Sequence, residues 1–79
     1  MAKDLILYSG PECHLCELAE QVISQLPDGL LGEIVKVDIS KDHDAYHLYA
    51  LRIPVVKRTD NQQELGWPFD VIQLEGFLS

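Results

Sequence analysis

The pattern that most constrains the fold of this chain is a short apolar run followed by apolar residues at helical spacing. Residues 5–8 (LILY) form the run, and residues 9–11 (SGP) close it as a loop. The next apolar residues repeat with the spacing of one helix face at Leu15, Leu18, Ala19, Val22 and Leu26. Residues 27–29 (PDG) then end that helix.

A second strand is predicted at residues 33–39, which alternate and are rich in β-branched side chains. The crossover of roughly 25 residues between the two strands is long enough to make them a parallel pair. The first strand, apolar throughout, is expected to be buried on both faces. The first half of the chain therefore predicts a βαβ unit.

The middle of the chain predicts a helix and then a hairpin. Ser40 can cap a helix whose inward residues are Ala45, Leu48, Tyr49 and Leu51. The Ile-Pro step at 53–54 ends this helix, and residues 55–58 and 63–66 form antiparallel strands around a polar turn.

The last helix has a start signal at Asp70. Gln73 stands three residues on, as in a capping box, while Phe69 and Leu74 hold the positions of a hydrophobic staple. This helix is expected to run to about Leu78. The predicted element order is β-α-β-α-β-β-α, in a single α/β domain that spans residues 1–79.

Charge and composition exclude several partners. The chain has 79 residues, of which 47% are hydrophobic and 24% charged, as in an ordinary globular domain with room for one core. Its formal net charge of −7 repels nucleic-acid phosphates and anionic membrane surfaces alike. The apolar run at 5–8 is too short for a signal sequence or a membrane span. We therefore expect a cytoplasmic monomer that binds neither nucleic acid nor membrane.

The two cysteines, Cys13 and Cys16, carry the most informative chemistry. In the cytoplasm thiols are kept reduced, so a close pair is catalytic, redox-sensing or metal-binding rather than structural. Cys13 lies at the loop–helix junction, where the helix N-terminus stabilises a thiolate, and Cys16 lies one turn further and nearer the core. A protonated His14 would lower the pKa of Cys13, whereas Glu12 and Glu17 would raise it. We expect a Cys13 pKa of about 6–7.5.

Three other interpretations remain open on the residues alone. A disulfide that closes so small a loop stabilises a protein by only about 2 kcal/mol, so there is little reason to expect a purely structural disulfide here. Zinc could be held by Cys13 and Cys16 together with His43 and His47, although the sequence gap exceeds the usual finger spacing. The chain could also be a binding module without enzymatic activity, with or without zinc at the cysteines.

The order of elements, the stretch YSGPECHLC at residues 8–16 and the Ile-Pro step before a Val-Val strand resemble glutaredoxins within the thioredoxin fold. Small bacterial glutaredoxin-like proteins with a CHLC motif are the most similar subgroup. The resemblance implies a mixed four-stranded sheet with helices on both faces. It also implies a thiol-disulfide oxidoreductase in which Cys13 attacks and Cys16 resolves. Its substrate would be a disulfide-containing protein or a small thiol compound, and a cellular reductant would regenerate it.

The resemblance further implies a substrate groove beside the cysteines. Pro54 matches a cis-proline that packs opposite the CxxC pair and leaves the backbone of Ile53 free to hydrogen-bond an extended thiol substrate. The expected substrate-binding residues are Ile53, Pro54, His14, Leu15, Gly66 and Asp70. No metal or bound cofactor is expected. Tyr8, Trp67 and Phe69 are interpreted as core residues.

Glutathione is the reductant that the resemblance suggests, but the sequence keeps few of the features that bind glutathione in glutaredoxins. Residues 10–12 (GPE) contain no cation, and His14-Leu15 replaces Pro-Tyr between the cysteines. Residues 66–70 (GWPFD) keep one glycine and one aspartate, and Asp70 is equally explained as a helix cap. The basic residues near the expected groove are Arg52, Lys57 and Arg58, which on a hairpin more often protect a sheet edge.

Overall fold

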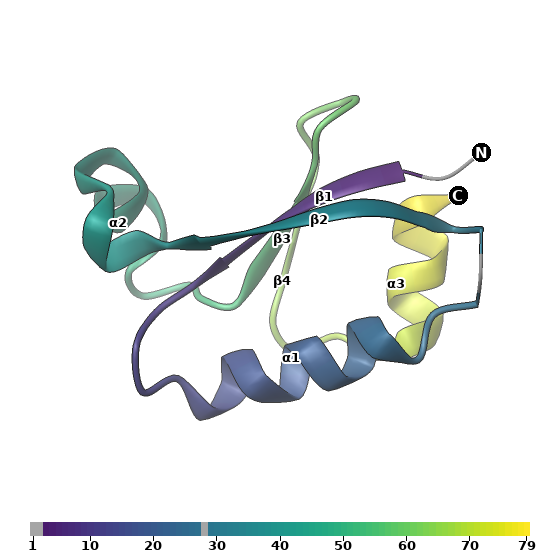
Figure 1. Ribbon diagram of the computed structural model, residues 1–79, viewed down its shortest axis with the longest axis horizontal. Helices are drawn as coiled ribbons and strands as arrows, with labels where there is room; N and C mark the ends of the chain where they lie inside the picture. Colours follow the sequence, from purple (N-terminus) through teal and green to yellow (C-terminus); the bar gives the residue numbers. More distant parts are fainter. Residues whose placement is uncertain (1–2, 28) are drawn as a thin grey trace.

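The computed structural model describes residues 3–27 and 29–79, which form a four-stranded sheet with helices on both faces (Figure 1). The elements are β1 (Lys3–Ser9), α1 (His14–Ser24), β2 (Leu31–Asp38), the 3₁₀ helix η1 (Ile39–Lys41), α2 (His43–Tyr49), β3 (Val55–Arg58), β4 (Glu64–Gly66) and α3 (Val71–Leu78). The predicted end of the first helix at Asp28 lies outside the described residues.

The sheet has the strand order β2-β1-β3-β4. Strand β1 pairs with β2 in parallel and with β3 antiparallel, and β3 pairs with β4 antiparallel. The predicted α/β order and mixed sheet of a thioredoxin-like fold are therefore confirmed. None of the helices in the described part of the chain is long and apolar enough to cross a membrane.

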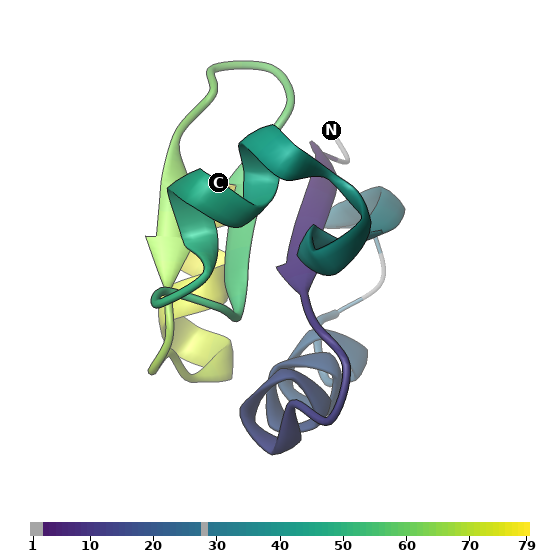
Figure 2. The ribbon, with the colours of Figure 1, turned by 90° about the vertical axis from the view of Figure 1, so that its left-hand side faces the viewer.

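Alternation along β1 divides the core into two layers. Leu5 and Leu7 face α1 and α3, where the larger cluster is completed by Ala19, Ile23, Val56, Phe69, Leu74 and Leu78. On the other face, Val55 packs with Ile39, Ala45 and Tyr49 under α2 (Figure 2). Tyr8 is packed against this second cluster, as expected, and Trp67 and Phe69 lie in or against the first.

The buried face of α1 differs from the predicted one by one position. Cys16, Ala19 and Ile23 are its buried residues, whereas Leu15 is 46% exposed. Successive helical residues are about 100° apart, so burying the Cys16 side turns Leu15 outward. The inward position predicted for Leu15 is therefore wrong.

The second helix also begins later than predicted. Residues 39–41 form the separate turn η1, and Asp42, not Ser40, caps α2 by accepting the N–H of Ala45 at 3.1 Å. The helix then buries Ala45 and Tyr49, four residues apart, while Leu48 and Leu51 are 62% and 101% exposed. The predicted inward positions of these two leucines are wrong because Ala45 and Tyr49 set the buried face of α2 and Leu51 lies beyond the end of the helix.

Parts of the sheet are more exposed than the sequence suggested, on the inner strand β1 as well as on the outer strand β2. Ile6 and Tyr8, on the α2 side of β1, are only partly buried because the short α2 covers one end of that face. On the outer strand β2, Ile34 and Val35 are exposed. Burial of β1 on both faces is thus incomplete.

The predicted start of α3 is confirmed. The Asp70 carboxylate accepts the N–H of Gln73 at 2.8 Å, and the Gln73 side chain accepts the N–H of Asp70 at 2.9 Å. At the other end, Arg58 donates to both carboxylate oxygens of Asp60, at 2.9 and 2.7 Å, and to the Phe77 carbonyl at 2.7 Å. The Arg58 hydrogen bonds lower the pKa of Asp60 to about 2. Buried Arg58 therefore joins the hairpin to α3 and is not edge protection.

A polar contact ties α2 to β4. The Tyr49 hydroxyl donates to Oε2 of Glu64, and Arg52 donates to Oε1 of Glu64 at 3.1 Å. Tyr8 stacks on the Tyr49 ring with 4.1 Å between centroids. Burial, and then the Glu64 bond, raise the pKa of Tyr49, while the same bond lowers the pKa of Glu64. This contact holds the helix that leads into the Pro54 loop.

Replacing Tyr49 with Phe tests that contact. The substitution keeps the buried ring and removes the hydroxyl that donates to a carboxylate, so we expect the free energy of unfolding to fall by about 1–2 kcal/mol. Urea denaturation at pH 7, followed by circular dichroism, measures it. Tyr46→Phe on the exposed face of the same helix is the matched control and should change stability by less than about 0.5 kcal/mol.

The loss of unfolding free energy caused by Tyr49→Phe should become smaller both in acid and in strong alkali. The pKa of Glu64 is lowered in the folded protein. The stabilisation that Glu64 contributes through this contact is therefore fully present above its unfolded pKa near 4.5 and is lost on acidification. The pKa of Tyr49 is raised in the folded protein. The stabilisation that its protonated hydroxyl contributes is therefore present below pH 10 and is lost in stronger alkali. A cost that stayed constant down to about pH 3 would contradict the assigned contact.

Candidate functional site

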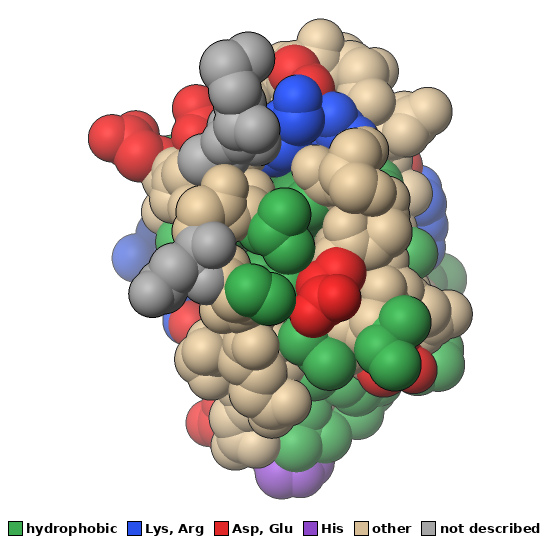
Figure 3. Space-filling view, turned by 90° about the vertical axis from the view of Figure 1, so that its right-hand side faces the viewer, with side chains coloured by type: hydrophobic (Ala, Val, Ile, Leu, Met, Phe, Trp, Pro, Cys, Tyr) green, Lys and Arg blue, Asp and Glu red, His purple; other side chains and the backbone are tan. Residues whose placement is uncertain are grey.

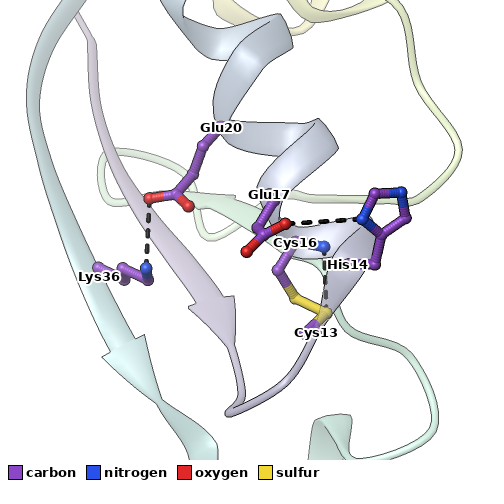
Figure 4. Close-up of a disulfide and its surroundings, with 6 residues drawn as sticks. All are labelled: Cys13, His14, Cys16, Glu17, Glu20 and Lys36. Atoms are coloured by element: carbon purple, nitrogen blue, oxygen red, sulfur yellow. Dashed lines mark hydrogen bonds and ion pairs between the residues drawn. A yellow bond between two sulfur atoms is a disulfide. The ribbon is translucent and has the colours of Figure 1, made fainter.

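Cys13 and Cys16 lie where the loop after β1 enters the first turn of α1 (Figure 4). Their Cα atoms are 5.2 Å apart and their sulfurs are joined as a disulfide. Cys13 is the N-cap of α1, in an extended conformation with φ −100°, and its Sγ accepts the N–H of Cys16 at 3.0 Å. The unpaired N–H groups of a first helical turn favour negative charge there. The fold thus brings the two predicted catalytic residues together in their expected positions.

The two sulfurs differ in their access to solvent. Cys16 is 3% exposed on the buried face of α1, whereas Cys13 is only partly buried at the end of the loop. An incoming reagent therefore meets the Cys13 side of the pair first. This asymmetry suits Cys13 as the attacking thiol and Cys16 as the internal one.

Charged side chains around the pair are mostly acidic. His14 Nδ1 lies 3.5 Å from Oε2 of Glu17, and both side chains are exposed. Glu20 pairs with Lys36 of β2 at 3.3 Å, a contact that the sequence reasoning missed and that only the parallel β1–β2 arrangement could have suggested (Figure 4). Glu12, directly before Cys13, is exposed and has φ 54°, in the left-handed region.

The Pro54 loop contacts the loop before Cys13. A Cβ added at Gly10 would lie 3.0 Å from Cδ1 of Ile53 and 3.9 Å from Cγ1 of Ile39, so these segments pack closely. The Ile53–Pro54 peptide bond is cis, in agreement with the position matched by resemblance. The Ile53 N–H, however, donates to the Tyr49 carbonyl at 3.1 Å. The predicted contact between the Ile53 backbone and a substrate therefore cannot use this N–H, and substrate binding by Ile53 stays a prediction.

The two remaining residues predicted to bind substrate are Gly66, the last residue of β4, and Asp70, the N-cap of α3. Gly66 pairs with Val55 of β3, and the next residue, Trp67, donates its N–H to the Pro54 carbonyl at 3.1 Å. This places Gly66 beside the cis-proline. Asp70 uses its carboxylate in the α3 capping box, so its observed role is structural and a role in substrate binding stays a prediction.

The basic residues and histidines considered as ligands have other neighbours. Arg52 pairs with Glu64 and lies over the Tyr49 ring, with 5.4 Å from Cζ to the centroid. His43 and His47 contact each other edge to face on α2, with centroids 4.5 Å apart. Within residues 3–27 and 29–79, no three histidine, cysteine or acidic side chains are grouped to bind a metal. The zinc site of Cys13, Cys16, His43 and His47 is thus not formed.

In the reduced protein, the two thiols should react with iodoacetamide at different rates. Single-thiol variants Cys16→Ala and Cys13→Ala isolate Cys13 and Cys16, and we expect Cys13 to react at least about tenfold faster because it is less buried than Cys16 and lies at a helix N-terminus. Mass spectrometry of quenched samples gives both rates. In urea, which unfolds both variants, the rates should converge. Equal rates in the folded proteins would contradict the assigned asymmetry.

Comparison with known proteins places this geometry in a family. Residues 4–79 match the family model described as a glutaredoxin-like domain (DUF836). No curated protein matched the chain significantly.

Solved structures with the same fold come from two bacteria. The crystal structure of protein XcR50 from X. campestris is 35% identical, with a TM-score of 0.80 over 94% of this chain and 93% of that one. The solution structure of XcR50 gives a TM-score of 0.79 over 94% and 90% of the two chains. Protein Ne2328 from Nitrosomonas europaea is 26% identical, with a TM-score of 0.81 over 98% of this chain and 92% of that one.

Proposed function

Because this chain belongs to the glutaredoxin-like domain family, we propose that it is a dithiol–disulfide oxidoreductase that uses Cys13 and Cys16. One observation carries the proposal. The partly exposed Cys13 sulfur accepts a helix N-terminal N–H within bonding distance of the buried Cys16 sulfur. A nucleophile at the surface and a second thiol behind it are what a two-step disulfide exchange requires.

The reaction transfers two electrons from the protein to the substrate. The Cys13 thiolate attacks one sulfur of a substrate disulfide, forms a mixed disulfide with it and releases the other substrate sulfur as a thiolate. Cys16 then loses its proton to solvent and attacks the Cys13 sulfur. This step forms the Cys13–Cys16 disulfide and releases the second substrate thiolate, so the substrate is reduced and the protein oxidised.

The site offers contacts for an extended substrate beside Cys13. Leu15, turned outward next to the cysteines, and the partly buried Ile53 supply apolar surface, whereas the side chain of cis-Pro54 is fully buried beside them. The Ile53 carbonyl is the backbone group that we assign to a substrate N–H, since the Ile53 N–H is already used by Tyr49. We assign His14 and Gly66 to the rim of this groove.

The cycle closes when a cellular reductant returns the pair to two thiols. We propose a small thiol such as glutathione, or a reductase, in the cytoplasm, where reduced thiols are maintained. The substrate class is a disulfide-containing protein or a small disulfide. The protein acts as a monomer, because one chain holds both cysteines and the groove.

Two serine variants test the assignment of roles. Cys13→Ser should lose the reduction of bis(2-hydroxyethyl) disulfide, because the remaining thiol is buried. Cys16→Ser should instead accumulate a mixed disulfide between Cys13 and one half of the reagent, because the resolving thiol is absent. Mass spectrometry of acid-quenched samples distinguishes these products.

Wild-type protein is the control and should form its internal disulfide with no lasting adduct. Full activity in Cys13→Ser would refute the assignment of the nucleophile. If wild-type protein stayed reduced while unfolded protein reacted, the proposed activity would fail and a binding role on the same scaffold would replace it.

A further inference from the structure

The segment that contains the cysteines has no lysine or arginine, and its one histidine is His14. No lysine or arginine lies between Lys3 and Lys36, a stretch that covers the loop, both cysteines and the whole of α1. The acidic residues of the same stretch are Asp4, Glu12, Glu17, Glu20, Asp28 and Glu33. Of these residues, Glu12 and Glu17 lie nearest Cys13 in the chain, so the permanently charged groups beside the attacking sulfur are carboxylates.

Two of these carboxylates flank Cys13 directly. Glu12 precedes it in the loop, and Glu17 lies in the first turn of α1, where its only ion-pair partner within the described residues is the exposed His14 at 3.5 Å. His14 balances Glu17 only when protonated. Glu12 forms no ion pair in the described part of the chain. Negative charge therefore persists on the path to the Cys13 sulfur.

Four of the six lysine and arginine side chains pair with other acids, and Lys41 and Lys57 form no ion pair within the described residues. Lys36 pairs with Glu20 at 3.3 Å, Arg52 with Glu64 at 3.1 Å, and Arg58 with Asp60 at 2.7 Å. Lys3 lies 3.7 Å from the same Asp60 carboxylate. In Figure 3, which views the end of the molecule opposite α2, the larger group of Lys and Arg side chains lies at the top, away from the α1 side. No ion pair in the described residues brings one of them to the loop before Cys13.

We propose that this site prefers disulfides flanked by lysine or arginine in a peptide or protein, and disfavours disulfides that carry net negative charge. The inference rests on the proposed dithiol chemistry and names the substrate class of that same site. The Cys13 thiolate holds a negative charge beside Glu12 and Glu17, and the attack transfers that charge to the departing substrate thiolate. Cations on the substrate are attracted by all three charges on approach and by the two carboxylates in the mixed disulfide, whereas anions are repelled. Glu12 and Glu17 are then specificity residues.

The experiment compares two symmetric peptide disulfides that differ only in their flanks, Lys-Cys-Lys and Glu-Cys-Glu. Pre-reduced protein is mixed with each one, and formation of the Cys13–Cys16 disulfide is followed by alkylation and mass spectrometry. The ratio of the two rate constants is divided by the ratio obtained when dithiothreitol reduces the same two peptides. This division removes the difference in intrinsic reactivity between the two peptide disulfides. Changes in the Cys13 pKa affect both peptides and cancel in the ratio.

We expect the corrected ratio to favour the basic peptide by at least about fivefold, from an effect of about two- to fivefold per exposed charge. Glu12→Lys should lower the ratio about five- to twentyfold, and Glu12→Gln should lower it by a smaller factor. Glu33→Lys makes the same change in net charge at the far end of β2 and should leave the ratio within about twofold. Raising the ionic strength to about 1 M should bring the ratio toward one.

A corrected ratio near one at low salt, or one that Glu12→Lys and Glu33→Lys shift equally, would overturn the charge preference and leave the dithiol function standing. If neither peptide oxidised the protein, the dithiol function itself would fall, and the preference with it.

Discussion

The chemistry of this molecule depends on how the first turn of α1 is rotated against the sheet. Burial of Ala19 and Ile23 beneath Leu5 and Leu7 fixes that rotation, and Cys16 lies on the same buried stripe. Cys13, the N-cap, must then lie at the boundary with solvent, where its sulfur accepts the Cys16 N–H. The same packing that stabilises the domain therefore makes one sulfur accessible and keeps the other behind it.

The opposite side of the site is held by a different set of contacts. Tyr49 and Arg52 meet Glu64 of β4, so the end of α2 is fixed relative to the hairpin. The chain that leaves this helix carries Ile53 to within contact of the loop before Cys13, and the Pro54 carbonyl accepts the Trp67 N–H. Both faces of the sheet thus contribute to one site at the end of β1, although their cores are separate clusters.

Periodicity and start signals predicted the framework well. The parallel β1–β2 pair, the hairpin and the Asp70 capping box depend on spacing and local chemistry, which are visible in sequence. The exposure of Leu15, Leu48 and Leu51 could not be predicted in the same way. Which of two adjacent residues a helix buries depends on the elements that pack against it, and these are not visible in the local sequence. Arg58 was likewise misjudged, since its bond to the Phe77 carbonyl joins residues far apart in the chain.

The site was predicted unevenly for the same reason. Two cysteines one turn apart at a helix start must lie close together, so their pairing followed from spacing alone. Zinc ligation by His43 and His47 required a tertiary approach that the fold does not make, and the Ile53 N–H is bonded to Tyr49 at the end of the preceding helix. Local geometry was predictable, whereas contacts between elements were not.

The most direct measurement of the central claim is a redox titration of the cysteine pair. Purified protein would be equilibrated across dithiothreitol redox buffers, and its free thiols counted by mass after alkylation. We expect one reversible two-electron transition in which both thiols disappear together, with no populated single-thiol species. Thiols that stayed unreactive across the series, or that oxidised separately, would contradict the assignment of Cys13 and Cys16 as a redox couple.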